Sequence, residues 1–366
     1  MRITFTGDIL CYKSQDKASM VGKGTYDYNP VFEEIKPLFA HSDYIVGSFE
    51  TTLAGKESGY TSADISFNTP DEFLRALKDT GFNLLTTANN HCFDRGLLGL
   101  ERTMRQIQKE GLEYTGTRLS AEDPPYLIKT LNDTRIAFLA YTYGTNSMLN
   151  GVMIPKGREY LVNLTRPQDP IIHRPLWKQI AKAILSPLLR SHNKAGIVGD
   201  CVSVAELNEG RNTDYESAMI NMVKQAKNDA DIVIMCLHSG GQFNSKVGAY
   251  TEHLFDILAN SGVDAIICNH PHTTLPIYKH GNCLIASALG NFSFAPGEGY
   301  WVEGVKAEYS ALLHIEVEDH HITGFKVDVC KCVNNGNGLA ITVPANESDE
   351  DYNVVLERLR IDEYDN

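Results

Sequence analysis

Short apolar runs alternate with helical stretches along most of the chain, and this alternation limits the possible folds more than any other feature. The runs that we predict to be strands are Arg2–Thr6, Tyr44–Ser48, Leu84–Ala88, Ile136–Tyr141, Ile232–Leu237, Ala265–Cys268 and Leu284–Ser287. The intervening stretches that we predict to be helices are Pro30–Ala40, Pro70–Thr80, Gly99–Glu110, Asp214–Asn228 and Thr251–Asn260. Several strands are almost continuously apolar, which is typical of strands buried on both faces. The alternation therefore predicts an α/β fold with right-handed crossovers.

Two local patterns indicate where elements begin and end. Thr69 and Pro70 precede two acidic residues, which predicts a helix with Thr69 as its cap and Pro70 in its first turn. Near the end of the chain, Tyr309–Glu318 and Ile322–Cys332 lie on either side of Asp319–His321. This pattern is typical of an antiparallel hairpin.

Residues 145–213 interrupt the alternation. They hold five prolines and a basic segment, Arg174–Arg190, whose apolar residues recur at helical spacing. We interpret this segment as an inserted helix packed on the body; a membrane-surface or partner helix is the alternative, which Pro187 disfavours because it cuts the helix short. We therefore expect one domain over residues 1–332 with an insertion at about 145–213, followed by a C-terminal extension, 333–366, that packs on the domain or trails from it.

Charge and cysteine content narrow the class of protein. The net charge is −13, from 33 basic and 46 acidic residues, and no long basic block is present, so we expect no nucleic-acid partner. No apolar run reaches the ~18 residues of a membrane span, and residues 1–8 do not resemble a signal peptide. These features favour a cytoplasmic protein, with a removed anchor as the alternative. The eight cysteines are scattered, which indicates reduced, mostly buried thiols.

Polar side chains follow six of the predicted strands. These residues are Asp8, Glu50, Asn89, Asn90, His91, His238, His270, His272 and Asn291. In an open α/β sheet, ligands bind beyond the carboxyl ends of the strands. Carboxylate, amide and imidazole groups bind divalent metals, and imidazole suits transition metals in particular. We therefore expect this edge to form one cluster that binds a metal.

Each of these residues also has an ordinary structural interpretation. Asp8 could cap a turn, Glu50 could be a solvated residue at a strand end, and a lone His238 is more often a core histidine. The segment His270-Pro271-His272 is more specific, because two imidazoles on a proline-stiffened loop can both converge on a metal. Since all the residues occur together at strand ends, we favour the metal interpretation for the set.

The order of these segments resembles the CapA family of bacterial capsule and poly-γ-glutamate synthesis proteins, within the calcineurin-like metallophosphatase superfamily. The matching segments are Phe5-Thr6-Gly7-Asp8, Ser48-Phe49-Glu50-Thr51, Ala88-Asn89-Asn90-His91 with Asp94 and Gly96, His238-Ser239-Gly240, His270-Pro271-His272 and Ala288-Leu289-Gly290-Asn291-Phe292. The resemblance covers residues 1–330. It implies a four-layer αββα sandwich of two mixed β-sheets flanked by helices.

The resemblance also implies a role for each site residue. Asp8 looks like the first metal-binding acid and Glu50 like the acid that bridges two metals, with Asn90, His238 and His270 on one metal and His272 on the other. His91 looks like the residue that protonates the leaving group. Apart from the resemblance, Asp94 could orient His91 or cap the following helix, and we favour the cap. Asn89, Arg95 and Asn291 are candidate substrate-binding residues, with Arg118 as a further candidate.

Some positions differ from the usual pattern of the superfamily. Leu10 stands where many metallophosphatases have a histidine, and Glu50 replaces the usual bridging aspartate. Ser48 and Gln242 stand where the family often has Asn and Glu. A site with one metal therefore remains an alternative to a site with two, and Mn, Zn and Fe are the candidate ions.

Two functions follow from the resemblance. The first is a metal-dependent phosphoesterase linked to capsule or poly-γ-glutamate synthesis, acting on a phosphorylated or anionic small molecule or polymer. The second is a non-catalytic accessory protein that binds a polymer or a capsule-synthesis complex on the same scaffold, because a fold does not determine an activity. The sequence leaves the oligomeric state open.

Overall fold

The computed structural model describes residues 1–62, 66–171, 199–296 and 304–360. Within these ranges, the first sheet contains β1 (Arg2–Ile9), β4 (Tyr44–Phe49), β5 (Leu84–Thr86), β6 (Glu113–Thr115), β13 (Asn291–Ser293), β14 (Tyr309–Glu318), β15 (His321–Asn334) and β16 (Ala340–Pro344). Its strand order is β16-β15-β14-β1-β4-β5-β6, with β13 beside β1. Strand β1 pairs in parallel with β4 and antiparallel with β14, so the sheet is mixed.

The second sheet contains β7 (Leu127–Leu131), β8 (Thr134–Thr142), β9 (Ile232–His238), β10 (Ala265–Asn269), β11 (Thr274–His280) and β12 (Cys283–Leu289). Its order is β11-β12-β10-β9-β8-β7. The four inner strands are parallel and the two edge strands are antiparallel to their neighbours. A small separate hairpin pairs β2 (Met20–Gly22) with β3 (Thr25–Tyr26).

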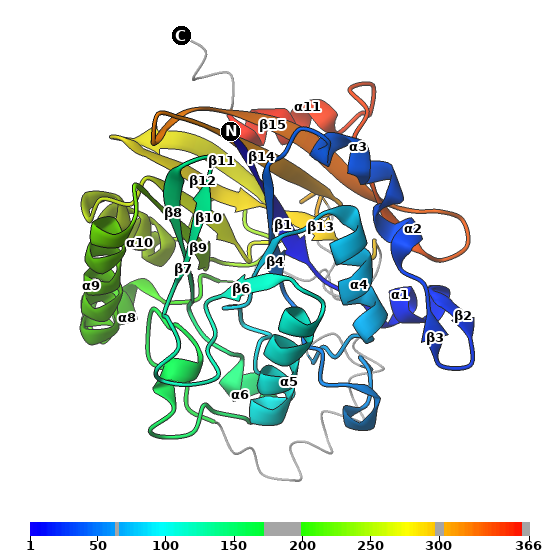
Figure 1. Ribbon diagram of the computed structural model, residues 1–366, viewed down its shortest axis with the longest axis horizontal. Helices are drawn as coiled ribbons and strands as arrows, with labels where there is room; N and C mark the ends of the chain where they lie inside the picture. The colour runs from blue at the N-terminus through cyan, green and yellow to red at the C-terminus, as the bar shows by residue number, and fades with distance from the viewer. Residues whose placement is uncertain (63–65, 172–198, 297–303, 361–366) are drawn as a thin grey trace.

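Helices flank the two sheets, and the longer ones lie on their outer sides (Figure 1). They are α1 (Lys13–Ala18), α2 (Asn29–Phe32), α3 (Lys36–Phe39), α4 (Asp71–Thr80), α5 (Gly96–Lys109), α6 (Ser147–Asn150), α8 (Val204–Asn208), α9 (Thr213–Asp229), α10 (Ala249–Asn260) and α11 (Tyr352–Leu359). Helices α2 to α4 lie beside the first sheet, and α9 and α10 lie beside the second.

The fold has four layers of secondary structure: helices, the first sheet, the second sheet, and helices again. Three layers of apolar side chains lie between them. The middle layer lies between the sheets, where Phe5 of β1 contacts Phe138 of β8 with ring centroids 6.5 Å apart. An outer layer packs Leu77 of α4 on the first sheet, and the other packs Val223 of α9 on the second. Strands apolar on both faces can be buried only in such an arrangement. The αββα sandwich expected from the sequence is confirmed.

The helix predicted over Pro30–Ala40 is interrupted in the structure. It consists of α2, a 3-10 turn at Glu33–Ile35 and α3, each four residues long or shorter. Pro37 lies inside α3 and has no backbone N–H with which to continue a regular helix. The prediction of one continuous helix was therefore wrong.

The start of α4 lies one residue later than the sequence predicts. Pro70 is the N-cap residue, with an extended ψ of 145°, and the helix proper begins at Asp71. The Thr69 hydroxyl is instead hydrogen bonded to the Thr51 hydroxyl at 2.7 Å. Thr69 therefore joins the loop after β4 to the start of α4 and does not cap the helix.

The predicted C-terminal hairpin is confirmed as β14 and β15. Its turn is tight because Asp319 and His320 both have positive φ, at 47° and 64°, as a two-residue hairpin turn requires. Strand β16 then pairs with β15 at the edge of the first sheet. The basic segment Arg174–Arg190 lies outside the described residues.

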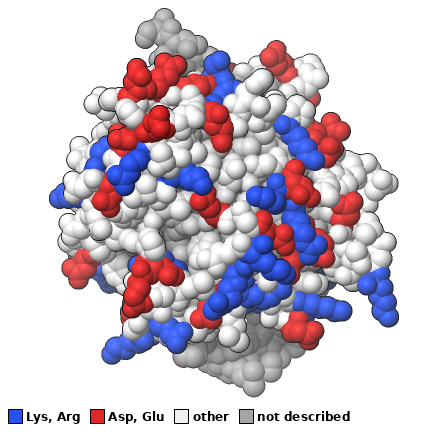
Figure 2. Space-filling model, viewed as in Figure 1, with Lys and Arg blue, Asp and Glu red and all other residues white. Residues whose placement is uncertain are grey.

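The surface carries both signs of charge (Figure 2). Acidic and basic side chains are interspersed on the face shown, and basic side chains gather over α5. Some of these charges are paired, as Arg102 of α5 is with Asp71 of α4 at 2.8 Å. Within the described ranges, no helix is long and apolar enough to span a membrane.

Candidate metal centre

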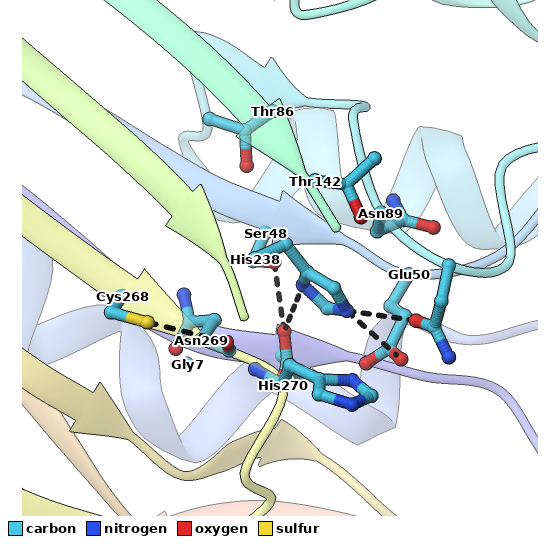
Figure 3. A network of polar contacts seen from close by, with 12 residues as sticks. Gly7, Ser48, Glu50, Thr86, Asn89, Thr142, His238, Cys268, Asn269 and His270 are labelled. Carbon is cyan, nitrogen blue, oxygen red and sulfur yellow. Dashed lines mark hydrogen bonds and ion pairs between the residues drawn. The ribbon is translucent and has the colours of Figure 1, made fainter. Parts of the chain in front are cut away.

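Strand ends bring together, between the two sheets, five side chains of types that can bind a metal. Asp8 lies in β1, Glu50 directly follows β4, His238 ends β9, and His270 and His272 follow β10. All five are buried, and Asp8 and Glu50 are completely so. The imidazole rings of His238 and His270 lie with centroids 4.8 Å apart. Figure 3 shows His238, His270 and Glu50 meeting at this point.

The donor atoms form two groups that share Glu50. Glu50, His238 and His270 form one group, and Asp8, Glu50 and His272 form the other; within each group one ligand atom per residue lies within 4.8 Å of the others. Glu50 Oε1 lies 3.5 Å from His238 Nε2 and 3.7 Å from His272 Nε2. Each group could hold a metal ion, with Glu50 between the two positions.

Unpaired polar atoms at this centre support the metal interpretation. Both carboxylate oxygens of Glu50, Nδ1 of His238 and Nδ1 of His270 are buried and have no hydrogen-bond partner among the described residues. Leaving such groups buried without partners is costly. A divalent cation would satisfy both carboxylate and imidazole donors, so the residues present fit a metal.

The protonation states of the cluster also suit metal binding. Burial lowers the pKa of His238 to about 4, and burial lowers the pKa values of His270 and His272 as well. These imidazoles are therefore neutral at neutral pH, as metal ligation requires. Burial, with the charge of Glu50 as the next cause, raises the pKa of Asp8, and burial raises the pKa of Glu50. A cation between the two carboxylates would favour their ionised forms.

The loop that carries the two later histidines has a strained backbone. His270 and His272 have φ values of 99° and 55°, in a region that side-chain-bearing residues rarely occupy. The His270 backbone N–H donates to Asp8 Oδ2 at 2.9 Å, and this bond holds the loop against β1. Strain of this kind occurs mainly at functional sites.

Neighbouring side chains orient the ligands. Asn90 Oδ1 lies 2.8 Å from His238 Nε2, which places the amide at the same group as His270. Asn291 Oδ1 lies 2.9 Å from His272 Nδ1, so the Nε2 of that ring is left to face Glu50. The Ser48 hydroxyl donates to Asp8 Oδ1 at 2.8 Å. Such outer contacts set the tautomer and direction of metal ligands.

His91 lies beside the metal-binding groups but is bound to an acid of its own. Its Nδ1 is 2.7 Å from Asp94 Oδ2, and its Nε2 is 3.9 Å from Glu50 Oε1. Burial lowers the pKa of His91, but the carboxylates of Asp94, Glu50 and Asp8 together outweigh it, so the pKa is raised. The imidazole therefore tends to carry a proton at its free Nε2.

The helix cap that the sequence favours for Asp94 does not form. The N-cap of α5 is Arg95, and no side chain caps the helix. Asp94 Oδ2 accepts hydrogen bonds from His91 and from the Phe67 backbone N–H, and Oδ1 accepts from the Asn150 side chain. Both oxygens are thus occupied at the site, and Asp94 orients His91.

The four residues predicted to bind substrate make other contacts in the structure. Asn89 hydrogen bonds only to backbone groups, including the Phe49 carbonyl at 2.7 Å. Asn291 orients His272. Arg95 donates to Ser66 and to the Gly59 carbonyl, and Arg118 donates to the Tyr160 carbonyl. None of the four lines the cavity at the centre, so each supports a loop or a ligand in this structure.

A cavity of about 460 Å³ opens over the centre. Asn90, His91, His270 and His272 line its floor. Residues of the insertion line its wall: Asn146, Met148, Leu149, Asp169, Gly199, Asp200 and Cys201. The volume is in the range of small-molecule sites.

Three residues at the site were not found from the sequence. Asn150 contacts Asp94 from the proline-rich insertion, where no strand end or motif marks it. Phe67 packs its ring edge-on against His91 with centroids 4.6 Å apart, and Tyr143 packs on His270 at 4.8 Å. Tyr143 does follow a predicted strand by two residues, which is the only signal that could have found it.

Comparison with known proteins agrees with the motifs. The family model described as "Bacterial capsule synthesis protein PGA_cap" matches residues 2–296. The chain belongs to this family. The resemblance to CapA proteins drawn from the sequence is thereby confirmed, and the PGA_cap match covers every residue of the candidate centre.

Two relatives carry the CapA name. The PGA biosynthesis protein CapA of Bacillus subtilis (strain 168) is 26% identical over 298 residues, which cover 80% of this chain and 63% of that protein. The capsule biosynthesis protein CapA of Bacillus anthracis is 26% identical over 326 residues, covering 87% and 64%. The chain thus spans less than two thirds of the length of either relative. A crystal structure of a hypothetical protein from Thermus thermophilus is 12% identical, with a TM-score of 0.46 over 90% of this chain and 99% of that one.

Proposed function

We propose that the chain is a divalent-metal-dependent phosphoesterase that acts in bacterial capsule or poly-γ-glutamate synthesis, the process named for its relatives. The observation that carries the proposal is the position of Glu50. One buried carboxylate belongs to both donor groups, and a shared carboxylate is what a pair of closely spaced metals needs. Two-metal sites of this kind are used for displacement at phosphorus.

The two donor groups each provide the residues that would hold one metal, and Asn90 belongs with the first group. Glu50, His238, His270 and Asn90 would hold one, and Asp8, Glu50 and His272 would hold the other. Metals bound there would neutralise the phosphoryl oxygens and acidify the attacking water. Imidazole-rich sites with carboxylates suit Mn, Zn or Fe.

His91 supplies the proton for the leaving group in this proposal. Its Nδ1 is held by Asp94, its Nε2 lies 3.9 Å from Glu50 Oε1, and the residue lines the cavity. A positioned imidazole that carries a proton near neutral pH can protonate an alkoxide as it leaves. Phe67 packs against the ring and limits its rotation.

Metal content and hydrolysis test the proposal together. Protein purified without chelator should contain Mn, Zn or Fe by elemental analysis, and after loading with Mn²⁺ it should hydrolyse members of a panel of phosphomonoesters and phosphodiesters. His280→Ala, which changes an exposed histidine away from the centre, should behave like the wild type. Metal binding without hydrolysis of any ester would favour the alternative, a polymer- or complex-binding accessory protein. A protein that binds no divalent metal would contradict the proposal.

A further inference from the structure

Apolar and aromatic side chains form one part of the cavity lining, which we call the apolar wall. They belong to Leu10, Tyr12, Phe67, Tyr143, Met148, Leu149 and Phe243. Met148 and Leu149 belong to the short helix α6, and their side chains are 44% and 56% exposed. Large apolar residues left open beside a candidate catalytic centre indicate a surface that a ligand covers.

The described lining of the cavity lacks the long cationic side chains that usually pair with an anion. None of the described residues that line the cavity is a lysine or an arginine. The two acidic residues in the wall are already engaged: Asp169 pairs with Arg166 at 2.7 Å, and Asp200 accepts the backbone N–H groups of Cys201 and Tyr250. An anionic group placed against Met148 and Leu149 would lose water without gaining a lysine or arginine partner among the described residues of the lining.

We propose that this cavity takes a phosphoester whose alcohol part is apolar and uncharged, and that Met148 and Leu149 select it. The inference rests on the proposed function for the position of the phosphoryl group. It goes beyond that function because it names the rest of the substrate. It also disfavours a polyanionic chain as the group bound beyond the phosphorus.

The position of α6 indicates which part of the substrate it contacts. Asn150, the last residue of α6, donates to Asp94 at 2.6 Å, and Asp94 holds His91. The helix that carries Met148 and Leu149 is therefore hydrogen bonded to Asp94, which in turn holds His91, the residue that would face the leaving oxygen. The group that lies against Met148 and Leu149 is the departing alcohol.

Binding of phosphonates tests the inference without requiring turnover. The probes are benzylphosphonate and phosphonoacetate, which present the same phosphonate with an apolar or an anionic substituent, and calorimetry on Mn²⁺-loaded protein measures both dissociation constants. We expect benzylphosphonate to bind at least ~10-fold more tightly, since burial of one ring contributes enough for such a factor. Met148→Lys/Leu149→Lys should remove this preference. Leu98→Lys, at a leucine of α5 that is 79% exposed and outside the cavity, should retain it.

A chain-length series separates the possible sources of the apolar group. If affinity keeps rising from butylphosphonate to octylphosphonate, the alcohol is a long-chain lipid; if it levels off near benzylphosphonate, it is a small alkyl or aryl alcohol. Equal binding of benzylphosphonate and phosphonoacetate, or tighter binding of phosphonoacetate, would overturn this inference alone. Binding of neither probe would overturn the proposed function with it, whereas preferential benzylphosphonate binding without any hydrolysis would support the inference and contradict only the catalytic step.

Discussion

Asn150 donates a 2.6 Å hydrogen bond to Asp94 Oδ1, and the other oxygen of the same carboxylate lies 2.7 Å from His91 Nδ1. Asn150 and Asp94 are 56 positions apart in the chain. Together they connect α6 to the imidazole of His91, which lies beside the candidate metal ligands. Asp94 is buried, so the loss of one of its partners would change its position or leave an oxygen unsatisfied.

Asn150→Ala should therefore impair proton donation more than metal binding. We expect turnover to fall about tenfold on alkyl phosphates, whose leaving oxygen needs a proton, and much less on nitrophenyl phosphate, whose leaving group does not. Metal content should stay at the wild-type value. Asn221→Ala, at an exposed position of α9, is the matched control. An equal loss on both esters would indicate that Asn150 is only structural.

Substitutions of His91 and His270 should separate catalysis from metal binding. Removing a general acid typically lowers the rate by about a hundredfold to ten-thousandfold, so His91→Ala should retain bound metal and lose turnover. His270→Ala should lose metal, because His270 is one of the four residues that would hold the ion at its group, and Asn90→Ala should weaken binding there. Elemental analysis and steady-state kinetics measure the two effects. If His91→Ala emptied the centre as fully as His270→Ala, these roles would be misassigned.

Substitution of Glu50 should weaken the binding of both metals, whereas substitution of a single histidine should weaken only one. Because Glu50 belongs to both donor groups, Glu50→Gln should weaken both metals. His238→Ala should weaken one and His272→Ala the other. Calorimetric titration of chelator-treated protein with Mn²⁺ gives the number of sites in each variant. A Glu50→Gln protein that binds as many metals as the wild type would contradict the shared role.

Asp16 should make stability depend on pH, away from the metal centre. Burial raises its pKa to about 6 from 3.8, although Tyr28 and Cys11 hydrogen bond to it. The folded state therefore binds this proton more tightly than the unfolded state. The stabilisation is complete below about pH 4 and is lost as pH rises through 6.

Asp16→Asn should lack this pH-dependent loss. The free energy of unfolding of the variant, relative to the wild type, should increase by about 1–3 kcal/mol between pH 4 and pH 8. Urea unfolding at a series of pH values measures the change, and the exposed-site variant Asp79→Asn serves as the control. A difference between Asp16→Asn and wild type that stays constant across this range would contradict the assignment.

Gly7 is required where β1 passes β13. A Cβ atom at Gly7 would lie 2.1 Å from the Gly290 carbonyl oxygen, while the Asp8 backbone N–H donates to that oxygen at 2.8 Å. Gly7→Ala should therefore cost about 1–3 kcal/mol of stability through overpacking, and it should weaken metal binding because Asp8 would shift. Thermal unfolding and metal titration measure both. Gly324→Ala, where a Cβ meets nothing within 4 Å, should change neither.

The insertion shows where a prediction from sequence needs revision. We treat the insertion as an addition to the domain, and its beginning does line the cavity, but Leu161, Val162 and Leu164 are buried in the core between the sheets. The Asn163 carbonyl also accepts the Thr142 backbone N–H, next to the end of β8. Deletion of all of residues 145–213 would thus remove core residues, and substitutions within α6 are the appropriate test of what the insertion contributes to the cavity.

Local patterns in the sequence determined the central strands of both sheets, the helices α4, α5, α9 and α10, the C-terminal hairpin and the strand-end residues of the centre, because burial on two faces and turn chemistry are encoded in neighbouring residues. Only the tertiary structure decided that Glu50 lies in both donor groups, that Asp94 orients His91 and does not cap α5, and that Asn150 reaches Asp94. Each of these contacts joins side chains from separate elements. Their geometry depends on how two sheets and a long insertion pack together, and no periodicity along the chain records that packing.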